Sequence, residues 1–340
     1  MAELATAASA LLEGLTEAAL IAAGGRVTAA NSAARSLLGR AIEGAPVDQV
    51  ISHPAALEAL ERSDAGEAVE LTGLGRSRRH WLMRIAPLAD ETSLIRFVDR
   101  SEARAAEQMR VDFVANASHE LRTPLATLIG YTETLREQAD EIDPVTRERF
   151  LSVVQDEARR MQRVVEDLIS LSRIEAEKFT APTEAIALEP LIDQALESER
   201  RTADERGSAL VRDVASGLPR IAGDRGQIVQ LLDNLLSNAL RYGEAGTPVT
   251  VDVRAEGPMV RLSIGDHGEG IAPEHVARVT ERFYRVDTSR SRSLGGTGLG
   301  LSIVKHIVER HRGRLSIDSE LGRGTTVHVL LPVAAREAVS

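Results

Sequence analysis

The spacing of apolar residues divides the chain into three stretches. Up to about residue 98, short apolar runs are separated by glycine-containing turns, a pattern that predicts strands and short helices. From Ser101 to Lys178 apolar residues recur every three or four positions, which predicts helices throughout. Beyond about residue 185 both spacings occur again, so strands and helices alternate. We therefore predict a multidomain protein, with domains over residues 10–98, 101–178 and 185–335.

The first stretch predicts a small α/β domain. Strands are expected at 18–21, 26–30, 68–72, 80–85 and 94–98. The Gly24-Gly25 pair suits the turn of the first hairpin, and Asn31 is placed to cap a helix over 32–38. Two strands, helices and three returning strands resemble a PAS domain, which implies that a small ligand is sensed here. The alternatives are a module that only packs and dimerises, and a haem domain using His53 or His80.

The second stretch predicts an antiparallel helical hairpin. Its first helix covers Ser101 to Gln138 with a mild kink at Pro124, and Asp143-Pro144 begins the second. A heptad seam on the second helix consists of Val154, Met161, Val164, Leu168 and Leu171. Glu157 is the exception within that seam. Two helices leave an apolar stripe uncovered, so we predict a homodimer joined in a four-helix bundle. The alternative is that a neighbouring domain of the same chain covers the stripe.

The third stretch predicts an α+β sandwich, in which helices cover one face of a mixed sheet. Strands are expected at 185–188, 209–214, 249–254, 260–265, 315–319 and 325–331. Helices are expected at 189–205, 227–241 and 299–310.

Composition and charge narrow the classes of protein to which the chain can belong. Hydrophobic residues make up 43% of the chain, as in folded domains, and the absence of cysteine excludes disulfides and thiolate metal sites. The net charge of −10 disfavours nucleic acid as a partner. No apolar run approaches the ~18 residues of a membrane span. We therefore expect a cytoplasmic protein, or the soluble portion of a membrane-bound sensor.

A histidine, a carboxylate and a hydroxyl lie close together on the first long helix. His119 and Thr123 are four residues apart and share one face, with Glu120 beside them. A carboxylate that holds one ring proton leaves the other ring nitrogen free to act as a nucleophile. The segment Phe113 to Leu125 resembles the H box of sensor histidine kinases. The resemblance implies that His119 is the phosphate acceptor, Glu120 the general base, and Thr123 a group that positions water for dephosphorylation.

The third domain carries motifs that resemble the Bergerat-type ATPase fold of histidine kinases, gyrases, Hsp90 chaperones and MutL proteins. The first resembles an N box, in which Asn234 and Asn238 project from one helical face. Amide oxygens are suited to Mg²⁺, and the resemblance makes Asn238 the direct ligand. Arg241 can meet phosphate oxygens, and Tyr242 can stack on the base.

A second motif, Gly265 to Ile271, resembles the G1 box and follows an alternating strand. A buried carboxylate at Asp266 can accept a hydrogen bond from the exocyclic amine of adenine, whereas guanine presents a carbonyl there. The site would therefore select ATP over GTP. Gly268 and Gly270 would let the backbone approach the nucleotide.

The third motif, Gly295 to Lys305, resembles the G2 box. Its glycines precede a helix, whose free N–H groups can cradle phosphates, and the resemblance makes the loop a nucleotide contact. The loop residues concerned are Gly296, Gly298, Leu299 and Gly300. A dinucleotide fingerprint is disfavoured because a polar loop, not a strand, precedes the glycines. An upstream F box and a mobile lid would offer Arg285, Arg290 and Arg292 to phosphates, unless these form only a solvated basic loop.

Taken together, the motifs identify the chain as resembling a two-component sensor histidine kinase that uses ATP and Mg²⁺. The resemblance implies autophosphorylation of His119 and transfer to an aspartate of a response regulator, with dephosphorylation of that regulator as a second activity. In style the chain is most similar to phosphate-regulon sensor kinases, which usually begin with membrane helices. Two alternatives are a conformational ATPase of the gyrase or Hsp90 kind, which has no use for His119, and a scaffold without turnover.

Overall fold

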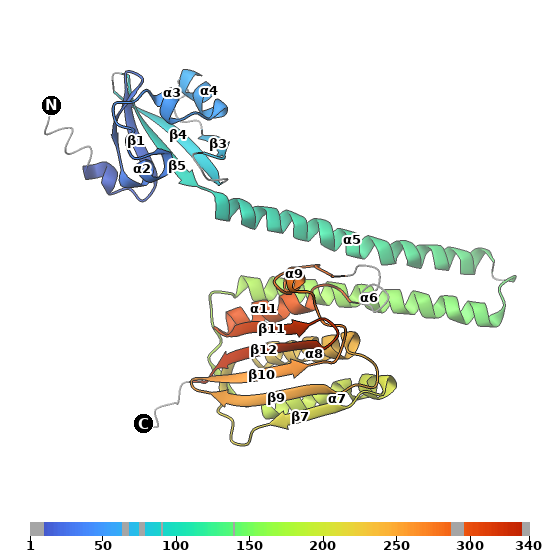
Figure 1. The fold of residues 1–340 in the computed structure, drawn as a ribbon. Coiled ribbons are helices and arrows are strands. Elements are labelled where there is room, and N and C mark those ends of the chain that lie inside the picture. The colour runs from blue at the N-terminus through green and yellow to red at the C-terminus, as the bar shows by residue number, and fades with distance from the viewer. Residues whose placement is uncertain are drawn as a thin grey trace. The chain divides into compact units, whose positions relative to one another are not determined.

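The computed structural model describes residues 10–62, 68–74, 79–89, 91–138, 140–286 and 296–334 (Figure 1). They form two compact units, Met1–Val114 and Ala115–Ser340, and the boundary falls within the long helix α5 (Ser101–Glu137). The finer division into three domains stays a prediction. Within the described residues, no helix combines the length and the apolarity that crossing a membrane requires.

The first unit is built on an antiparallel sheet of five strands in the order β2-β1-β5-β4-β3. The strands are β1 (Ala18–Ala23), β2 (Arg26–Ala30), β3 (Ala68–Thr72), β4 (His80–Ala89) and β5 (Thr92–Asp99). Helices α2 (Ser32–Leu38), α3 (Val47–Val50) and α4 (Pro54–Arg62) follow β2 in the chain. Leu20, Met83, Ile95 and Phe97 are fully buried and belong to one apolar core. The five predicted strands and the helix at 32–38 are confirmed.

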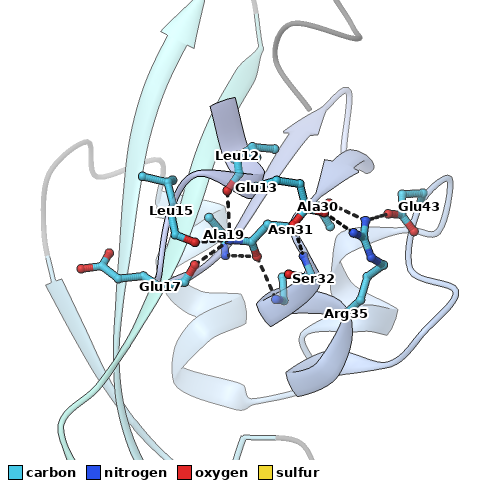
Figure 2. A network of polar contacts seen from close by, with 11 residues as sticks. Leu12, Glu13, Leu15, Glu17, Ala19, Ala30, Asn31, Ser32, Arg35 and Glu43 are labelled. Atoms are coloured by element: carbon cyan, nitrogen blue, oxygen red, sulfur yellow. Dashed lines mark hydrogen bonds and ion pairs between the residues drawn. The ribbon is translucent and has the colours of Figure 1, made fainter. Parts of the chain in front are cut away.

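Asn31 connects the segment before β1, strand β1 and helix α2 (Figure 2). Its side chain is fully buried and caps α2, because Oδ1 accepts hydrogen bonds from the N–H groups of Ala34 (2.9 Å) and Ala19 (3.0 Å). Its Nδ2 donates to the carbonyl oxygens of Leu12 (3.2 Å), Leu15 (3.3 Å) and Glu17 (2.7 Å). The predicted cap is therefore confirmed, and it also holds the segment that precedes β1.

Helices α5 and α6 (Pro144–Ala176) form the predicted hairpin (Figure 1). Asp143 caps α6 by accepting hydrogen bonds from the N–H groups of Val145 and Thr146, both at 3.0 Å. Val164 and Leu171 of the predicted seam are fully buried within the single chain. Helix α6 packs against α11 (Gly300–Arg310) of the following domain, so that domain covers part of the hairpin.

The C-terminal domain is a mixed five-stranded sheet in the order β11-β12-β10-β9-β7, in which only the β7–β9 pair is parallel. Its strands are β7 (Leu210–Val214), β9 (Val249–Glu256), β10 (Met259–Gly265), β11 (Arg314–Glu320) and β12 (Gly324–Pro332). The helices are α7 (Glu189–Arg206), α8 (Arg225–Tyr242), the short α9 (Pro273–Val276) and α11. Helices α7, α8 and α11 pack together and against the sheet, which confirms the predicted layers.

One predicted strand lies outside this sheet. Residues 185–188 were expected to join it, but β6 (Glu184–Ile186) pairs with β8 (Ile221–Gly223) in a separate two-stranded sheet. An isolated bridge between Ile221 and Val333 connects β8 to the end of β12. The prediction that residues 185–188 join the main sheet was wrong. Strand β8 is too short to show the alternation of a β-strand, so the sequence did not indicate it as the partner of β6.

Candidate nucleotide and phosphoacceptor site

A cavity of about 790 Å³ lies between α8, the end of β10 and the loop before α11. Its volume falls in the range of ~300–1,000 Å³ that small-molecule sites usually have. Most of the predicted nucleotide contacts line it, namely Asn234, Asn238, Arg241, Tyr242, Asp266, Gly268, Gly270, Gly296, Gly298 and Gly300. The structure therefore brings the three separated motifs to one cavity.

The two asparagines of α8 face the start of α11. Leu232, Leu236 and Leu240 are buried and lie two residues from one asparagine or both, on the opposite side of α8, which leaves the amides on the cavity side. Nδ2 of Asn234 donates to the carbonyl of Gln230 (3.0 Å), so its Oδ1 points the other way. A Cβ at Gly300 would lie 2.9 Å from that Oδ1 and 3.6 Å from Nδ2 of Asn238. Only glycine at position 300 leaves room between the amides and the loop of residues 296–300, here called the glycine loop.

Asp266 directly follows β10, and its carboxylate is half-buried in the cavity wall. Its Oδ1 accepts a hydrogen bond from the N–H of Gly268 (2.8 Å). Burial raises the pKa of this carboxyl, while the hydrogen bonds from the Gly268 and Thr325 backbones act in the opposite direction. The geometry fits an acceptor for an amine donor, because one carboxylate oxygen is held by the protein backbone.

The glycines of the motifs also have packing reasons that the sequence analysis did not foresee. A Cβ at Gly268 would lie 2.2 Å from the carbonyl oxygen of Tyr242, and one at Gly270 would lie 2.1 Å from that of Glu320. Gly298 has φ +74°, and its carbonyl oxygen accepts a hydrogen bond from the N–H of Phe283 (2.8 Å). These close approaches hold the cavity walls together before any ligand is considered.

The remaining predicted contacts differ in their burial and in whether they line the cavity. Arg241 is largely buried, and Tyr242 is exposed at the rim. Leu299 is fully buried and does not line the cavity, and its N–H is donated to Oγ1 of Thr297 (3.2 Å). Arg285 lines the wall. Arg290 and Arg292, the other predicted lid contacts, lie outside the described residues.

The predicted acceptor His119 lies exposed on α5. The hydroxyl of Thr123 donates to the His119 carbonyl (3.3 Å), which places both on one face of the helix. Glu120 points elsewhere, because its Oε2 lies 3.1 Å from Nη2 of Arg160 and 3.9 Å from Nη1 of Arg285. Arg285 lines the cavity, so the H box and the cavity wall are in contact within this unit.

Sequence reasoning missed Arg160 and the contribution of α6 to the cavity. Arg160 is 8% exposed and pairs with both Glu120 and Glu157, the latter at 3.8 Å. Glu157 is the residue that breaks the heptad seam, and that break was the available signal for a polar pair inside the hairpin. Three further side chains of α6 line the cavity, namely Arg163, Glu166 and Asp167. No sequence signal placed them there.

The donor set fits a nucleotide accompanied by Mg²⁺. No group of three His, Asp or Glu side chains that could hold a metal occurs in the part of the chain described. Mg²⁺ keeps several waters and is usually held by one or two protein oxygens together with substrate phosphates. An amide oxygen such as that of Asn238, beside a glycine loop at a helix start, suits that mode.

Comparison with protein families matches both motif-bearing regions. Residues 109–177 match the His Kinase A (phospho-acceptor) domain. Residues 223–335 match the histidine kinase-, DNA gyrase B-, and HSP90-like ATPase. The phospho-acceptor match argues against a conformational ATPase of the gyrase or Hsp90 kind.

The chain is also similar to named proteins. It is 36% identical to the phosphate regulon sensor protein PhoR of Pseudomonas aeruginosa, over 87% of this chain and 67% of that protein. It is 38% identical to the sensor-like histidine kinase SenX3 of Mycolicibacterium smegmatis, over 69% of this chain and 60% of that protein. It is 40% identical to the sensor histidine kinase WalK of Bacillus subtilis, but spans only 38% of it.

Among solved structures, the histidine kinase ThkA, in complex with the response regulator TrrA, matches 97% of this chain and 99% of its own. The TM-score is 0.55 and the identity 20%, so the likeness concerns the fold. The similarity to PhoR, together with the phospho-acceptor and ATPase domains, shows that the chain belongs to the two-component sensor histidine kinases, which are ATP-dependent protein-histidine kinases.

Proposed function

We propose that the chain transfers the γ-phosphoryl group of ATP to His119 and then to an aspartate of a response regulator. One observation carries the proposal: a single cavity gathers Asn238, Asp266 and the glycine loop, and its wall residue Arg285 contacts the H box through Glu120. Neither the cavity motifs alone nor the H box alone would distinguish a kinase from another nucleotide-binding protein. Their contact within one unit supports phosphoryl transfer.

Each residue has a chemical task in this proposal. Asp266 accepts a hydrogen bond from the adenine amine, and Asn234, Asn238 and the glycine loop hold the phosphates. Asn238 would also hold Mg²⁺, which supplies positive charge to the transferred group when it is bound. Arg241 at the same wall offers a cation to phosphate oxygens.

The transfer exchanges one bond for another. A ring nitrogen of His119 forms a bond to the γ-phosphorus of ATP, the bond from that phosphorus to the bridging oxygen breaks, and ADP leaves. The remaining ring N–H is oriented, and its proton accepted, by Glu120. In the arrangement described, Arg160 pairs with the Glu120 carboxylate. Glu120 must therefore leave Arg160, at least in part, before it serves His119.

A second activity follows from the position of Thr123. Its hydroxyl lies one helical turn from His119 on an exposed face, where a phosphorylated regulator could dock. A hydroxyl there can hold a water in line with a phosphoaspartate. We include dephosphorylation of the regulator in the proposed function for this reason.

The assembly and the signal are also part of the proposal. We propose a homodimer formed through the exposed apolar residues of the hairpin, acting where cytoplasmic ATP is available. The first unit would be a PAS-like sensory domain, a proposal supported by its order of strands and by the helices that separate β2 from β3. The relative PhoR makes phosphate limitation a candidate signal for this chain.

The test is incubation of the chain with γ-labelled ATP and Mg²⁺. We expect acid-labile, alkali-stable label on the protein, as phosphohistidine requires, and none on His119→Ala. His80→Ala is the matched control, because His80 is also exposed but lies outside every motif. Label that persists in His119→Ala would refute the assignment of the acceptor. Bound ATP without any label would favour the scaffold alternative.

A further inference from the structure

Asp167 of α6 reaches the glycine loop of the cavity. Its Oδ2 accepts a hydrogen bond of 2.8 Å from Oγ1 of Thr297, the residue between Gly296 and Gly298. The same Thr297 oxygen accepts the N–H of Leu299 (3.2 Å). A carboxylate from the helical hairpin therefore takes the hydroxyl proton of Thr297, which carries the one hydroxyl among residues 296–300.

The surroundings of Asp167 resemble those of a bound anion. It lines the cavity together with Arg163 and Arg241, whose positive charges favour its ionised form, whereas neighbouring Glu166 opposes it. Burial raises the pKa of the Asp167 carboxyl, and the Thr297 hydrogen bond lowers it. Thr297 and Arg241 are donors that the phosphates of a nucleotide would also need.

Further polar contacts join the C-terminal part of α6, from residue 170 onward, to the ATPase domain. Oγ of Ser170 donates to Oε1 of Gln230 (2.6 Å). Glu175 pairs with Arg282, and Glu177, which follows the last turn, lies 2.6 Å from Nη2 of Arg310. Asp167, unlike these residues, lines the cavity.

We propose that Asp167 is a substitute anion, which occupies the Thr297 hydroxyl of the glycine loop in place of a nucleotide phosphate. Binding of a triphosphate then displaces Asp167 and loosens the contact of α6 with the loop. By linkage, docking of α6 weakens triphosphate binding by the same factor. The hairpin thereby restrains the ATPase domain until nucleotide is bound. This inference rests on the proposed nucleotide site.

The test compares ligands that differ in phosphate, using the full chain. Asp167→Asn keeps an oxygen for the Thr297 hydroxyl but removes the charge. Asp156→Asn is the matched control, since it makes the same change at an exposed residue of α6 that lies outside the cavity. The dissociation constants of a non-hydrolysable ATP analogue with Mg²⁺ and of adenosine are measured for each variant, by calorimetry and ligand-observed NMR.

We expect Asp167→Asn to bind the ATP analogue about tenfold more tightly, with adenosine unchanged and Asp156→Asn within about twofold of the parent. Unchanged or weaker binding of the analogue would overturn the inference, as would an equal gain for adenosine or for Asp156→Asn. Adenosine binding also reports that the variant is folded. If the parent chain binds neither ligand, the nucleotide site itself is refuted, which is a separate result.

Discussion

At the scale of single residues, the hydrogen bond between Asp266 and Gly268 decides which way a substituted side chain turns. Because Oδ1 already accepts the Gly268 N–H (2.8 Å), the oxygen of an Asp266→Asn variant will stay there and its NH₂ will face the base. That NH₂ opposes the amine of adenine but can donate to the carbonyl of guanine. We expect ATP binding to fall about 100-fold and the preference for ATP over GTP to shrink or reverse. Competition binding measures both.

The same carboxylate predicts a pH dependence. Burial raises the pKa of Asp266, so on acidification it becomes protonated at a higher pH than an ordinary aspartate does. A protonated carboxyl is a poorer acceptor, and affinity for ATP should therefore fall as the pH is lowered through that raised pKa. Asp252→Asn on neighbouring β9 is the control for Asp266→Asn, because Asp252 pairs with Arg254 outside the cavity. An equal loss in both variants would contradict the assignment.

Thr123 and Thr127 form a matched pair on α5. Each hydroxyl donates to the carbonyl four residues earlier, Thr123 to His119 (3.3 Å) and Thr127 to Thr123 (3.2 Å). Only Thr123 lies one turn from the acceptor. We expect Thr123→Ala to lower the rate of regulator dephosphorylation at least tenfold with autophosphorylation nearly unchanged, and Thr127→Ala to alter neither. Assays with a phosphorylated regulator decide this, and equal effects of both variants would refute a specific role for Thr123.

At the scale of elements, Asn31 joins the segment before β1 to the start of α2 (Figure 2). Asn31→Ala removes five hydrogen bonds from a fully buried group, and we expect the first unit to lose about 3 kcal/mol of unfolding free energy. Asn31→Ser can still cap α2 and should lose less. Trp81 is the one tryptophan of the chain and lies in β4, so its fluorescence follows this unit during urea unfolding of the intact chain. Equal midpoints in all three proteins would contradict the prediction.

The elements also show what the sequence could predict. Helix α8 was foreseen because its apolar residues recur at the helical period, and that period also fixed the side on which Asn234 and Asn238 lie. The pairing of β6 with β8 could not be predicted, since each of these strands has three residues, too few to show a β period. Arg160 was missed because its main partner, Glu120, is 40 residues away in sequence, and only the broken seam at Glu157 hinted at it.

The candidate site also contains residues that the sequence predicts and residues that it does not. Motifs with fixed spacing named the cavity residues, because glycines before a helix and two asparagines four residues apart can be recognised within a short stretch of sequence. Asp167 carries no such spacing, and its bond to Thr297 spans 130 residues. Its role depends on how α6 packs on the ATPase domain, which side-chain patterns within either segment do not determine.

At the scale of the whole molecule, the hairpin exposes apolar residues that one chain does not cover. Leu125, Ile129, Val165 and Ile169 are each between 42% and 49% exposed, although α6 packs against α11 elsewhere. A second hairpin in a four-helix bundle would bury such residues, and covering a side chain that is already half-buried contributes about half of the ~1.5–3 kcal/mol of full burial. The homodimer is thus a prediction that rests on uncovered apolar surface.

A buried carboxylate would abolish such an assembly, because an unpaired charge cannot be desolvated cheaply. We expect the parent chain to be dimeric by light scattering at micromolar concentration, and Ile169→Glu to be monomeric with at least 100-fold weaker association. Val145→Glu is the control: Val145 is 79% exposed in the first turn of α6, where an acid also suits the helix dipole. An Ile169→Glu variant that still dimerises would show that this apolar surface does not form the dimer interface. A monomeric parent would favour the alternative, in which the ATPase domain of the same chain covers the apolar stripe of the hairpin. Phosphoryl transfer to His119 would then have to occur within one chain.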